Sequence, residues 1–358
     1  MNKLISFFLK SILIVTSGIR NRIVYLSFPD YDDMLRGLLP HLKKMEVIIL
    51  VSKDGSTPLW LDEYNVKVVD KKSIKGFYYL LSAQVIYFTH GIYSFYPKVN
   101  AKRQKIINLW HGMPLKNIGY LDGKTSVPDC HYCLATSDFF ADLMSKAFGL
   151  SLDDVIVSGL PRNDLLMKET KNDYLLALKN KYSTVVCWLP TYRKSNIGDI
   201  RSDGKSDYNI KYNWMIINEY YKRQNAILIL KPHPMDADIN TNIDFSNIII
   251  LTEDSMNDVN TSLYEVLSIT DMLWTDYSSV FIDYALTNKP IVFISPDISE
   301  YKASRGFAYD TDIYPLPGRS FKDVNEVLSC SLRELSISSN YDNSLYQKYK
   351  IFNFEALK

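Results

Sequence analysis

The chain has 358 residues, of which 47% are hydrophobic and 23% are charged, values that are ordinary for a folded protein. Lysine and arginine together number 41 and aspartate and glutamate 40, so the net charge is +1. This balance excludes recognition of nucleic acid through overall charge, and any affinity for anions must be local. At roughly 150 residues per domain, the length predicts two domains.

Residues 1–20 have the pattern of an amphipathic helix. The apolar stretch from Leu4 to Val15 is interrupted by Lys10, and it is shorter than the roughly 20 residues that span a bilayer. Lys3 and Lys10 share one face of the helical wheel, and apolar residues cover most of the rest. This pattern is typical of a helix lying in a membrane interface, but a helix packed on its own domain would also fit.

Beyond this segment, short apolar strands alternate with helical stretches, which predicts an α/β protein with two doubly wound domains facing a central cleft. We place these domains at residues 21–165 and 166–358. The expected strands are Ile23–Phe28, Val47–Val51, Val66–Val69, Val85–Thr89, Lys105–Leu109, Tyr132–Thr136 and Val155–Val157 in the first domain, and Thr184–Trp188, Ala226–Leu230, Ile248–Leu251, Met272–Trp274 and Ile291–Ile294 in the second.

The helices are less sharply defined than the strands. The clearest is Phe139–Phe148, which should end at Gly149. The segment Asn163–Lys181 is expected to hold the connecting helix, and residues from about 323 onward should form C-terminal helices. Because ligands of doubly wound sheets bind beyond the carboxyl ends of the strands, functional residues should directly follow strands.

Two histidines occupy such positions. His111 lies between the strand Lys105–Leu109 and Gly112, which permits a tight turn. A neutral imidazole there can accept a proton from an alcohol, although it could instead hold the turn through a backbone hydrogen bond. His233 follows a later strand between two prolines, and Lys231 places a positive charge beside it. A rigid turn with a packed histidine is the alternative for His233.

Two further strand ends carry groups suited to an anion. Arg193, which follows Thr184–Trp188, can bind a phosphate through two parallel hydrogen bonds or form a surface salt bridge. Ser278 and Ser279 precede an apolar helix, and the free N–H groups of a helix start attract anions, although plain capping would also explain both serines. Asp283 should lie on the same helical face and could accept hydrogen bonds from substrate hydroxyls.

The remaining motifs carry less information. Arg162 lies in the segment S-G-L-P-R-N-D at the expected domain junction, where a structural turn is the stronger interpretation. Cys130 and Cys133 form a lone C-x-x-C without the second ligand pair that a zinc site needs. Walker A and G-x-G-x-x-G motifs are absent. The sequence therefore predicts neither a metal nor a cofactor.

Taken together, the motifs LWHGMPLKNIG, SGLPRND, LPTYR, KPHP, TDYSSVFIDYALTNKPIVF and SEYKASRGFAYD resemble the CDP-glycerol glycerophosphotransferase family of teichoic acid and capsule synthesis. The resemblance covers roughly residues 85–315 and keeps the family's motif order. Its most specific pieces are the W-H-G turn and the stretch from T-D-Y-S-S to N-K-P. Met113 departs from the threonine often found there, which could alter the acceptor side.

The resemblance implies a GT-B fold, with two Rossmann-like domains and the donor held mainly by the C-terminal one. By motif position, His111 and His233 match the two functional histidines of the family. The implied donor-binding residues are Arg193, Lys231, Asp276, Ser278, Ser279, Asp283 and Arg305, and the implied acceptor-side turn contains Gly112 and Arg162.

The resemblance also implies the reaction and its partners. A hydroxyl of a lipid-linked saccharide or polyol-phosphate acceptor attacks the polyol-bearing phosphorus of CDP-glycerol or another CDP-polyol, and CMP leaves. His111 is the preferred base, while His233, Lys231 and Arg193 would stabilise charge on the pyrophosphate. The enzyme is expected to bind the cytoplasmic face of a bacterial membrane peripherally.

Two other functions are compatible with parts of the pattern. A GT-B glycosyltransferase would use a sugar nucleotide instead, and an inactive membrane-associated scaffold would need no donor. Asp283 and the W-H-G turn argue against the first of these. The presence of both histidines and Arg193 argues against the second.

Overall fold

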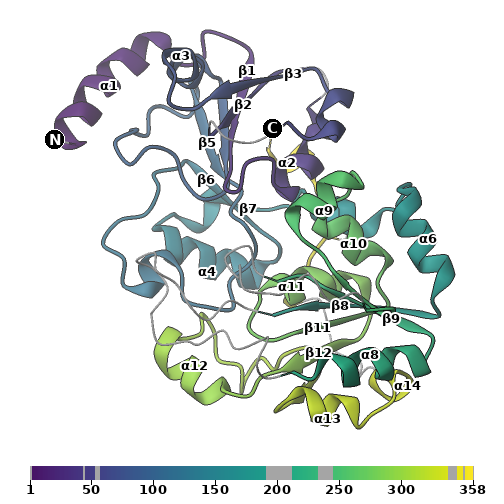
Figure 1. Cartoon of the computed structure of the whole chain (residues 1–358). Coiled ribbons are helices and arrows are strands. Elements are labelled where there is room, and N and C mark those ends of the chain that lie inside the picture. The colour runs from purple at the N-terminus through teal and green to yellow at the C-terminus, as the bar shows by residue number, and fades with distance from the viewer. Residues whose placement is uncertain are drawn as a thin grey trace. The chain divides into compact units, whose positions relative to one another are not determined.

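The computed structural model describes residues 2–42, 45–52, 57–190, 212–232, 245–337, 345–349 and 351–357. The chain divides into two compact units. The first unit comprises Met1–Leu165 and Ser344–Lys358, and the second comprises Leu166–Asn343. Each unit is an α/β structure built on its own sheet (Figure 1).

The described part of the first unit contains a seven-stranded sheet in the order β3-β2-β1-β4-β5-β6-β7, and every neighbouring pair is parallel. Most of its strands are largely apolar because helices cover both faces of such a sheet, whereas the edge strand β3 carries exposed residues. The elements are α1 (Asn2–Thr16), β1 (Arg22–Leu26), α2 (Asp33–Leu38), β2 (Glu46–Val51), β3 (Val66–Asp70), α3 (Ile74–Ser82), β4 (Val85–Phe88), β5 (Lys105–Asn108), β6 (Tyr132–Ala135), α4 (Asp138–Phe148) and β7 (Val155–Val157), followed by α5 (Asn163–Met167) at the junction of the units.

The described part of the second unit contains a six-stranded parallel sheet in the order β10-β9-β8-β11-β12-β13. Its elements are α6 (Asp173–Lys181), β8 (Thr184–Leu189), α8 (Trp214–Arg223), β9 (Ala226–Leu230), β10 (Ile248–Ile250), α9 (Glu253–Asp258), α10 (Leu263–Ile269), β11 (Met272–Thr275), α11 (Val280–Tyr284), β12 (Ile291–Ile294), α12 (Ile298–Arg305), β13 (Arg319–Phe321), α13 (Val324–Leu328) and α14 (Leu332–Leu335).

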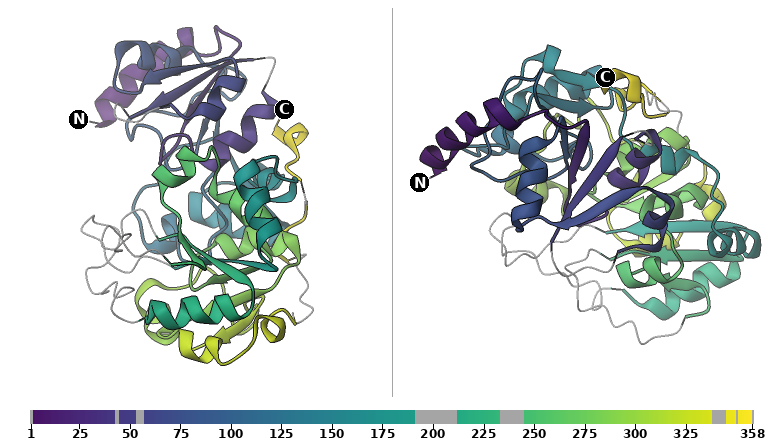
Figure 2. Two further views of the ribbon diagram at one scale, coloured as in Figure 1. Left: turned by 45° about the vertical axis from the view of Figure 1, so that its right-hand side comes forward. Right: turned by 90° about the horizontal axis from the view of Figure 1, so that it is seen from above.

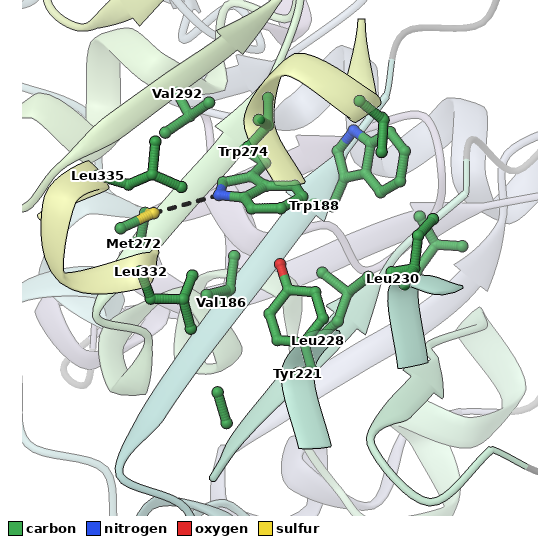
Figure 3. Packing of buried hydrophobic residues seen from close by; sticks show 14 of the residues in the cluster. Val186, Trp188, Tyr221, Leu228, Leu230, Met272, Trp274, Val292, Leu332 and Leu335 are labelled. Carbon is green, nitrogen blue, oxygen red and sulfur yellow. Dashed lines mark hydrogen bonds between the residues drawn. The ribbon is translucent and has the colours of Figure 1, made fainter. Parts of the chain in front are cut away.

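The second sheet is covered on both faces. Helices α8, α13 and α14 pack against one face, and α6, α9 and α10 pack against the other (Figure 1). Figure 3 shows the first of these cores, where the Trp274 ring lies near Trp188 and Tyr221 and its Nε1 donates to the Met272 sulfur at 3.1 Å. Because alternate residues of each strand point to opposite faces, strand residues next to one another in sequence belong to different cores.

The expected strands agree with the structure to within two residues at each end. The helix expected at Phe139–Phe148 is α4, which is capped by the Ser137 hydroxyl and ends at Gly149 in the left-handed region, with φ +64°. Strand β13 was missed because its three residues are polar or half-buried at the sheet edge, where no apolar run is required.

The C-terminal tail corrects the expected domain limits. We placed residues 166–358 in one domain, but Ser344–Lys358 packs with the first unit. The hydroxyls of Thr136 and Ser137 each donate to a tail carbonyl at 2.6 Å, and the Phe352 amide donates to Asp164 at 2.8 Å. These pairs join residues about 200 positions apart in the chain, so no local pattern could have revealed them.

Helix α1 packs on the first unit through part of its surface. Leu9 and Leu13 are buried, and Leu13 belongs to the same core as residues of α3 and the sheet. Phe7 and Phe8 are each 71% exposed, and four other apolar side chains of α1 are exposed beside them. In Figures 1 and 2, α1 lies beside α3 and its N-terminal end extends beyond the rest of the first unit. Within the described ranges, no helix is long and apolar enough to cross a membrane.

Candidate active site

Both sheets reverse their strand order at one point. In the first unit, β1 and β4 are neighbours, with β2 and β3 on one side and β5 to β7 on the other. In the second unit, the corresponding neighbours are β8 and β11. Loops that leave the carboxyl ends of such strands diverge, which makes room for a ligand. The residues that follow these strands are therefore the candidates for chemistry.

The turn after β5 places His111 at this edge of the first sheet. The Asn108 side chain accepts a hydrogen bond from the Trp110 amide at 2.9 Å, and Trp110 has a φ of +55°. Such backbone geometry costs a bulky residue about 1–3 kcal/mol and is concentrated at functional sites. Gly112 follows with a φ of +128°, which a residue with a side chain rarely adopts. The W-H-G motif is thus a sharp turn that points one imidazole away from the strand.

The His111 ring is held on three sides. Its Nδ1 lies 3.3 Å from the Thr89 carbonyl oxygen, which only accepts, so Nδ1 carries the proton. The ring centroids of His90 and Trp110 each lie 4.0 Å from that of His111. Burial, and then the neighbouring His90 and Arg162, hold the pKa of His111 well below that of an ordinary histidine. The ring is therefore neutral at physiological pH, with the lone pair on Nε2.

Arg162 contacts the W-H-G turn, although it lies in a different segment of the chain. Its Nη1 donates a hydrogen bond to the His111 carbonyl oxygen at 2.9 Å. The preceding segment also lies close to α2, because a Cβ atom at Gly37 would come within 2.1 Å of the Pro161 carbonyl oxygen. The motif S-G-L-P-R-N-D thus stabilises the W-H-G turn through the hydrogen bond from Arg162 to the His111 carbonyl. Arg162 also places a positive charge near the imidazole.

Three residues of this site were not anticipated. The side chains of Asp32 and Thr89 and the ring of His90 lie at the carboxyl ends of β1 and β4. The rings of His90 and His111 are stacked, with an interplanar angle of 8°. A signal was present in the sequence, because His90-Gly91 follows its strand just as His111-Gly112 follows the next one. Only the sheet order shows that the two strands are neighbours.

Asp32 anchors this arrangement. Its carboxylate accepts hydrogen bonds from the Tyr25 hydroxyl at 2.6 Å and from the Leu35 amide at 3.0 Å, and it also interacts with the Thr89 hydroxyl. Burial raises the pKa of Asp32 to about 6, while these hydrogen bonds act in the opposite direction. Asp33 next to it contributes a smaller repulsive effect. Asp32 is thus tied to Tyr25 and to the start of α2 near Thr89, whose carbonyl accepts from His111.

In the second unit, the expected donor-binding residues are largely engaged with protein. Lys231, just after β9, is 9% exposed and forms an ion pair with Glu253 at 2.8 Å. Asp276, just after β11, is 4% exposed and accepts a hydrogen bond from the Tyr277 amide at 2.6 Å. Both residues therefore lie at the carboxyl ends of the strands, where ligands of doubly wound sheets bind. Part of the charge of Lys231 is already balanced by Glu253.

Helix α11 differs from expectation. Ser279 stands at its N-cap position but makes no side-chain capping hydrogen bond, so the simple capping explanation for this serine is wrong. The helix has five residues and passes into a 3₁₀ turn at Ala285–Thr287. Asp283 is fully buried and accepts a hydrogen bond from the Tyr264 hydroxyl. This burial favours a structural role for Asp283, and its expected contact with substrate hydroxyls stays a prediction.

His233 and Arg193 lie outside the described residues, as does the side chain of Arg305, whose backbone ends α12. Met113, the departure from the family pattern, is completely buried. Its side chain therefore acts through packing of the turn. Among the described residues, no group of three or more histidine, cysteine, aspartate or glutamate side chains is arranged to hold a metal ion.

A family model described as CDP-Glycerol:Poly(glycerophosphate) glycerophosphotransferase matches residues 8–356. The chain belongs to this family. The expected enzyme class is thereby confirmed, and the match favours it over both a sugar-nucleotide glycosyltransferase and an inactive scaffold. The W-H-G turn and its stacked histidines are thus the strand-end site of a glycerophosphotransferase family member.

Similar proteins are enzymes of teichoic acid synthesis. The chain is 27% identical to the teichoic acid poly(glycerol phosphate) polymerase of Bacillus spizizenii, over 85% of this chain and 81% of that protein. It is also 27% identical to the teichoic acid glycerol-phosphate primase of Bacillus subtilis, over 78% of this chain and 71% of that protein. It spans 44% of a poly(ribitol-phosphate) polymerase of Bacillus spizizenii, at 26% identity.

Solved structures confirm the fold. The wall teichoic acid polymerase TagF superposes with a TM-score of 0.69 at 18% identity, over 99% of this chain and 91% of that one. A UDP-N-acetylglucosamine 2-epimerase from Listeria monocytogenes superposes with a TM-score of 0.53 at 11% identity, over 94% of each chain. Two parallel, doubly wound sheets together with these neighbours establish the expected GT-B fold.

Proposed function

We propose that this glycerophosphotransferase family member transfers glycerol phosphate, or a related polyol phosphate, from a CDP-activated donor to a hydroxyl of a lipid-linked or polymer acceptor. The observation that carries the mechanism is His111, a neutral imidazole fixed through Nδ1 at the carboxyl edge of the first sheet. The names of the relatives support glycerol phosphate as the transferred unit. A TagF histidine variant soaked with CDPG supports the donor class.

His111 has the properties of a general base. Its Nδ1 proton is directed to the Thr89 carbonyl, so Nε2 offers a lone pair in a fixed orientation. Because the pKa of His111 is lowered by burial, the ring stays neutral and ready to accept a proton. The stacked rings of His90 and Trp110 restrict its rotation. We therefore propose that the main contribution of this site to catalysis is to hold the base in a fixed orientation.

The reaction balances as an in-line displacement. The acceptor oxygen forms a bond to the donor phosphorus that carries the polyol, and the bond from that phosphorus to the CMP oxygen breaks. The hydroxyl proton passes to His111 Nε2, and CMP leaves as a phosphate monoester. Because CMP is a stable leaving group, orientation and charge stabilisation supply most of the remaining rate enhancement.

The second unit is proposed to hold the donor. Lys231 follows β9 and Asp276 follows β11, the two strands that flank β8, so both stand at the carboxyl ends of the strands, where ligands of this fold bind. We assign stabilisation of the pyrophosphate charge to Lys231, Arg193 and His233. The start of α11 at Ser278 and Ser279 is proposed to contribute backbone N–H groups to the same phosphates.

Release of CMP tests this function directly. The full chain is incubated with CDP-glycerol, CDP-ribitol, UDP-glucose and UDP-N-acetylglucosamine in the presence of bacterial membranes that contain lipid-linked acceptors, and the released nucleotide is quantified. We expect CMP from a CDP-polyol and no UMP or UDP from either sugar nucleotide. Release of UDP with transfer of the sugar, or release of no nucleotide in any mixture, would contradict the proposal.

We further propose that the enzyme binds the cytoplasmic face of the membrane through α1. Six apolar side chains of α1 are exposed, although Leu9 and Leu13 of the same helix are buried in the first unit. The exposed side is larger than packing on the domain requires, and Lys3 and Lys10 are exposed near it. Exposed apolar residues flanked by lysines favour a surface that contains anionic lipids. Packing on the domain therefore accounts for the buried side of this helix, and membrane binding is our proposal for the exposed side.

Point substitutions test this better than deletion, because removing α1 would also remove Leu13 from the core. The double substitution Phe7→Ser and Phe8→Ser should abolish sedimentation with phosphatidylglycerol vesicles while leaving the melting temperature nearly unchanged. The matched control is Leu152→Ser, which alters an apolar residue that is 57% exposed elsewhere on the first unit. Equal sedimentation of all three proteins, or none with the wild type, would contradict membrane binding through α1.

A further inference from the structure

His90 has no part in the proton transfer described above, yet its ring is stacked on that of the base. Its ring lies parallel to that of His111 at a centroid distance of 4.0 Å. His90 is exposed on the protein surface, whereas His111 is more enclosed. An exposed imidazole stacked on a catalytic one is accessible to the same ligand. Packing alone would be served equally well by an apolar ring.

The hydrogen bonds of Thr89 define the tautomers of both histidines. We assign the Thr89 hydroxyl proton to the nearby carboxylate of Asp32, which only accepts when it is ionised. The Thr89 oxygen must then accept from His90 Nδ1, which lies 3.0 Å away. The Thr89 carbonyl accepts from His111 Nδ1 in the same way. Both rings therefore direct a protonated Nδ1 toward one residue and carry their lone pairs on Nε2.

The charges around the pair keep both rings neutral. Although part of His90 reaches the surface, desolvation of its ring and then the Arg162 guanidinium lower the pKa of His90 to about 4. The nearby acidic groups are Asp32 and Asp33. Asp32 accepts hydrogen bonds from Tyr25 and from the Leu35 amide, and Asp33 is the first residue of α2. Two neutral acceptor nitrogens suit hydroxyl donors and do not suit a phosphate, which itself offers only acceptors.

We infer that His90 and His111 together bind an acceptor that ends in a vicinal diol, His111 receiving the proton of the attacking hydroxyl and His90 accepting a hydrogen bond from the hydroxyl on the adjacent carbon. The inference rests on the proposed function. Parallel rings with centroids 4.0 Å apart can offer their Nε2 atoms to hydroxyls on adjacent carbons, each at an ordinary length of about 2.7–3.2 Å, when both atoms lie on the same side of the stack. The unreacting hydroxyl thereby orients the attacking one, and His90 determines acceptor specificity.

The test compares two soluble acceptors. The first carries a terminal glycerol phosphate with its vicinal diol, and the second is the matched hydroxypropyl phosphate that lacks the neighbouring hydroxyl. CMP release from CDP-glycerol is measured for both. With the wild type we expect kcat/KM to favour the diol about tenfold, the factor that corresponds to roughly 1.4 kcal/mol, or one good hydrogen bond.

The deciding variant is His90→Phe, which keeps a flat ring on His111 and removes the acceptor nitrogen. We expect the preference for the diol to fall toward unity, mainly through a higher KM for the diol. Thr89→Val provides a second route, because it removes the hydroxyl that fixes the His90 tautomer, and it should weaken the preference partially. The matched control is His41→Phe, since His41 stacks on Phe354 at 5.5 Å instead of on His111, and it should retain the preference.

The outcomes separate this inference from the proposed function. If His90→Phe keeps the full preference, or lowers kcat/KM for both acceptors by the same factor, His90 does not recognise the second hydroxyl and the inference is overturned. If His90→Phe fails in either of these ways but His111→Ala loses turnover in the same assays, the proposed function stands and only the inference falls. If the wild type releases no CMP with either acceptor, both the proposed function and the inference fall.

Discussion

The two units have similar sheets but different chemistry at their reactive edges. In the first, the groups that follow the strands are neutral: two stacked imidazoles whose pKa values are lowered by burial. In the second, they are charged and enclosed, with Lys231 paired to Glu253 and Asp283 bound to Tyr264. Under the proposed function, the carboxyl ends of the strands accept a proton in the first unit and hold ions in the second.

This difference follows from the different requirements of a general base and of a buried ion. A base must be uncharged before the reaction, so burial of His111 improves its readiness while lowering its intrinsic basicity. A buried ion must be paired, because an isolated charge in a protein interior is unstable. The comparison predicts that substitutions in the first unit affect turnover, and that those in the second affect stability or donor affinity.

The largest effect is expected for His111→Ala. Loss of a general base slows a reaction by about two to four orders of magnitude, so kcat should fall by that factor. Donor binding and the circular dichroism spectrum should match those of the wild type, because the partly exposed ring can be removed without emptying a core. Turnover near the wild-type level would remove His111 from the mechanism.

The pH dependence of transfer is the next test. The active form of His111 is neutral, and its lowered pKa keeps it neutral as the pH falls below the ordinary histidine value of about 6.5. We therefore expect kcat/KM to stay constant from about pH 7.5 to below pH 6.5 and to decline only in more acidic solution. A decline centred at or above pH 6.5 would show that the base is an ordinary solvated histidine.

Arg162→Gln sharpens this measurement. Removing the guanidinium takes away a charge that lowers the pKa of His111, so the acidic decline should move to higher pH. An unchanged profile would show that burial and His90 set the pKa without a measurable contribution from Arg162.

In the second unit, Asp283→Asn should chiefly affect stability. The carboxylate is fully buried and bound by Tyr264, so its replacement should lower the free energy of unfolding by about 1–3 kcal/mol in urea titrations. Tyr264→Phe removes the other partner and should have an effect of similar size. A rise in donor KM without loss of stability would instead place Asp283 in contact with the donor.

The smallest stability effect is expected for Ser279→Ala. Because the Ser279 hydroxyl makes no capping hydrogen bond, the free energy of unfolding should change by less than about 0.5 kcal/mol. The KM for CDP-glycerol should nevertheless rise if the start of α11 contacts the donor phosphates. Unchanged KM and unchanged stability together would exclude Ser279 from the site.

Local patterns in the sequence determined most of the framework. Continuous apolar runs predicted all but one of the strands, because a parallel strand buried on both faces must be apolar throughout. The W-H-G turn was recognisable because a strand, a histidine and a permissive glycine are adjacent in the chain. The motif order likewise predicted the family, which the match over residues 8–356 establishes.

The tertiary structure decided how separate strand ends combine. Asp32, Thr89 and His111 are far apart in sequence, and only the order β1-β4-β5 makes their strands neighbours. The same is true of the C-terminal tail, which joins the first unit through hydrogen bonds to Thr136, Ser137 and Asp164. A sequence pattern records the period of one element and its turns. The pairing of two strand ends depends on sheet order and burial, which are properties of the whole folded chain.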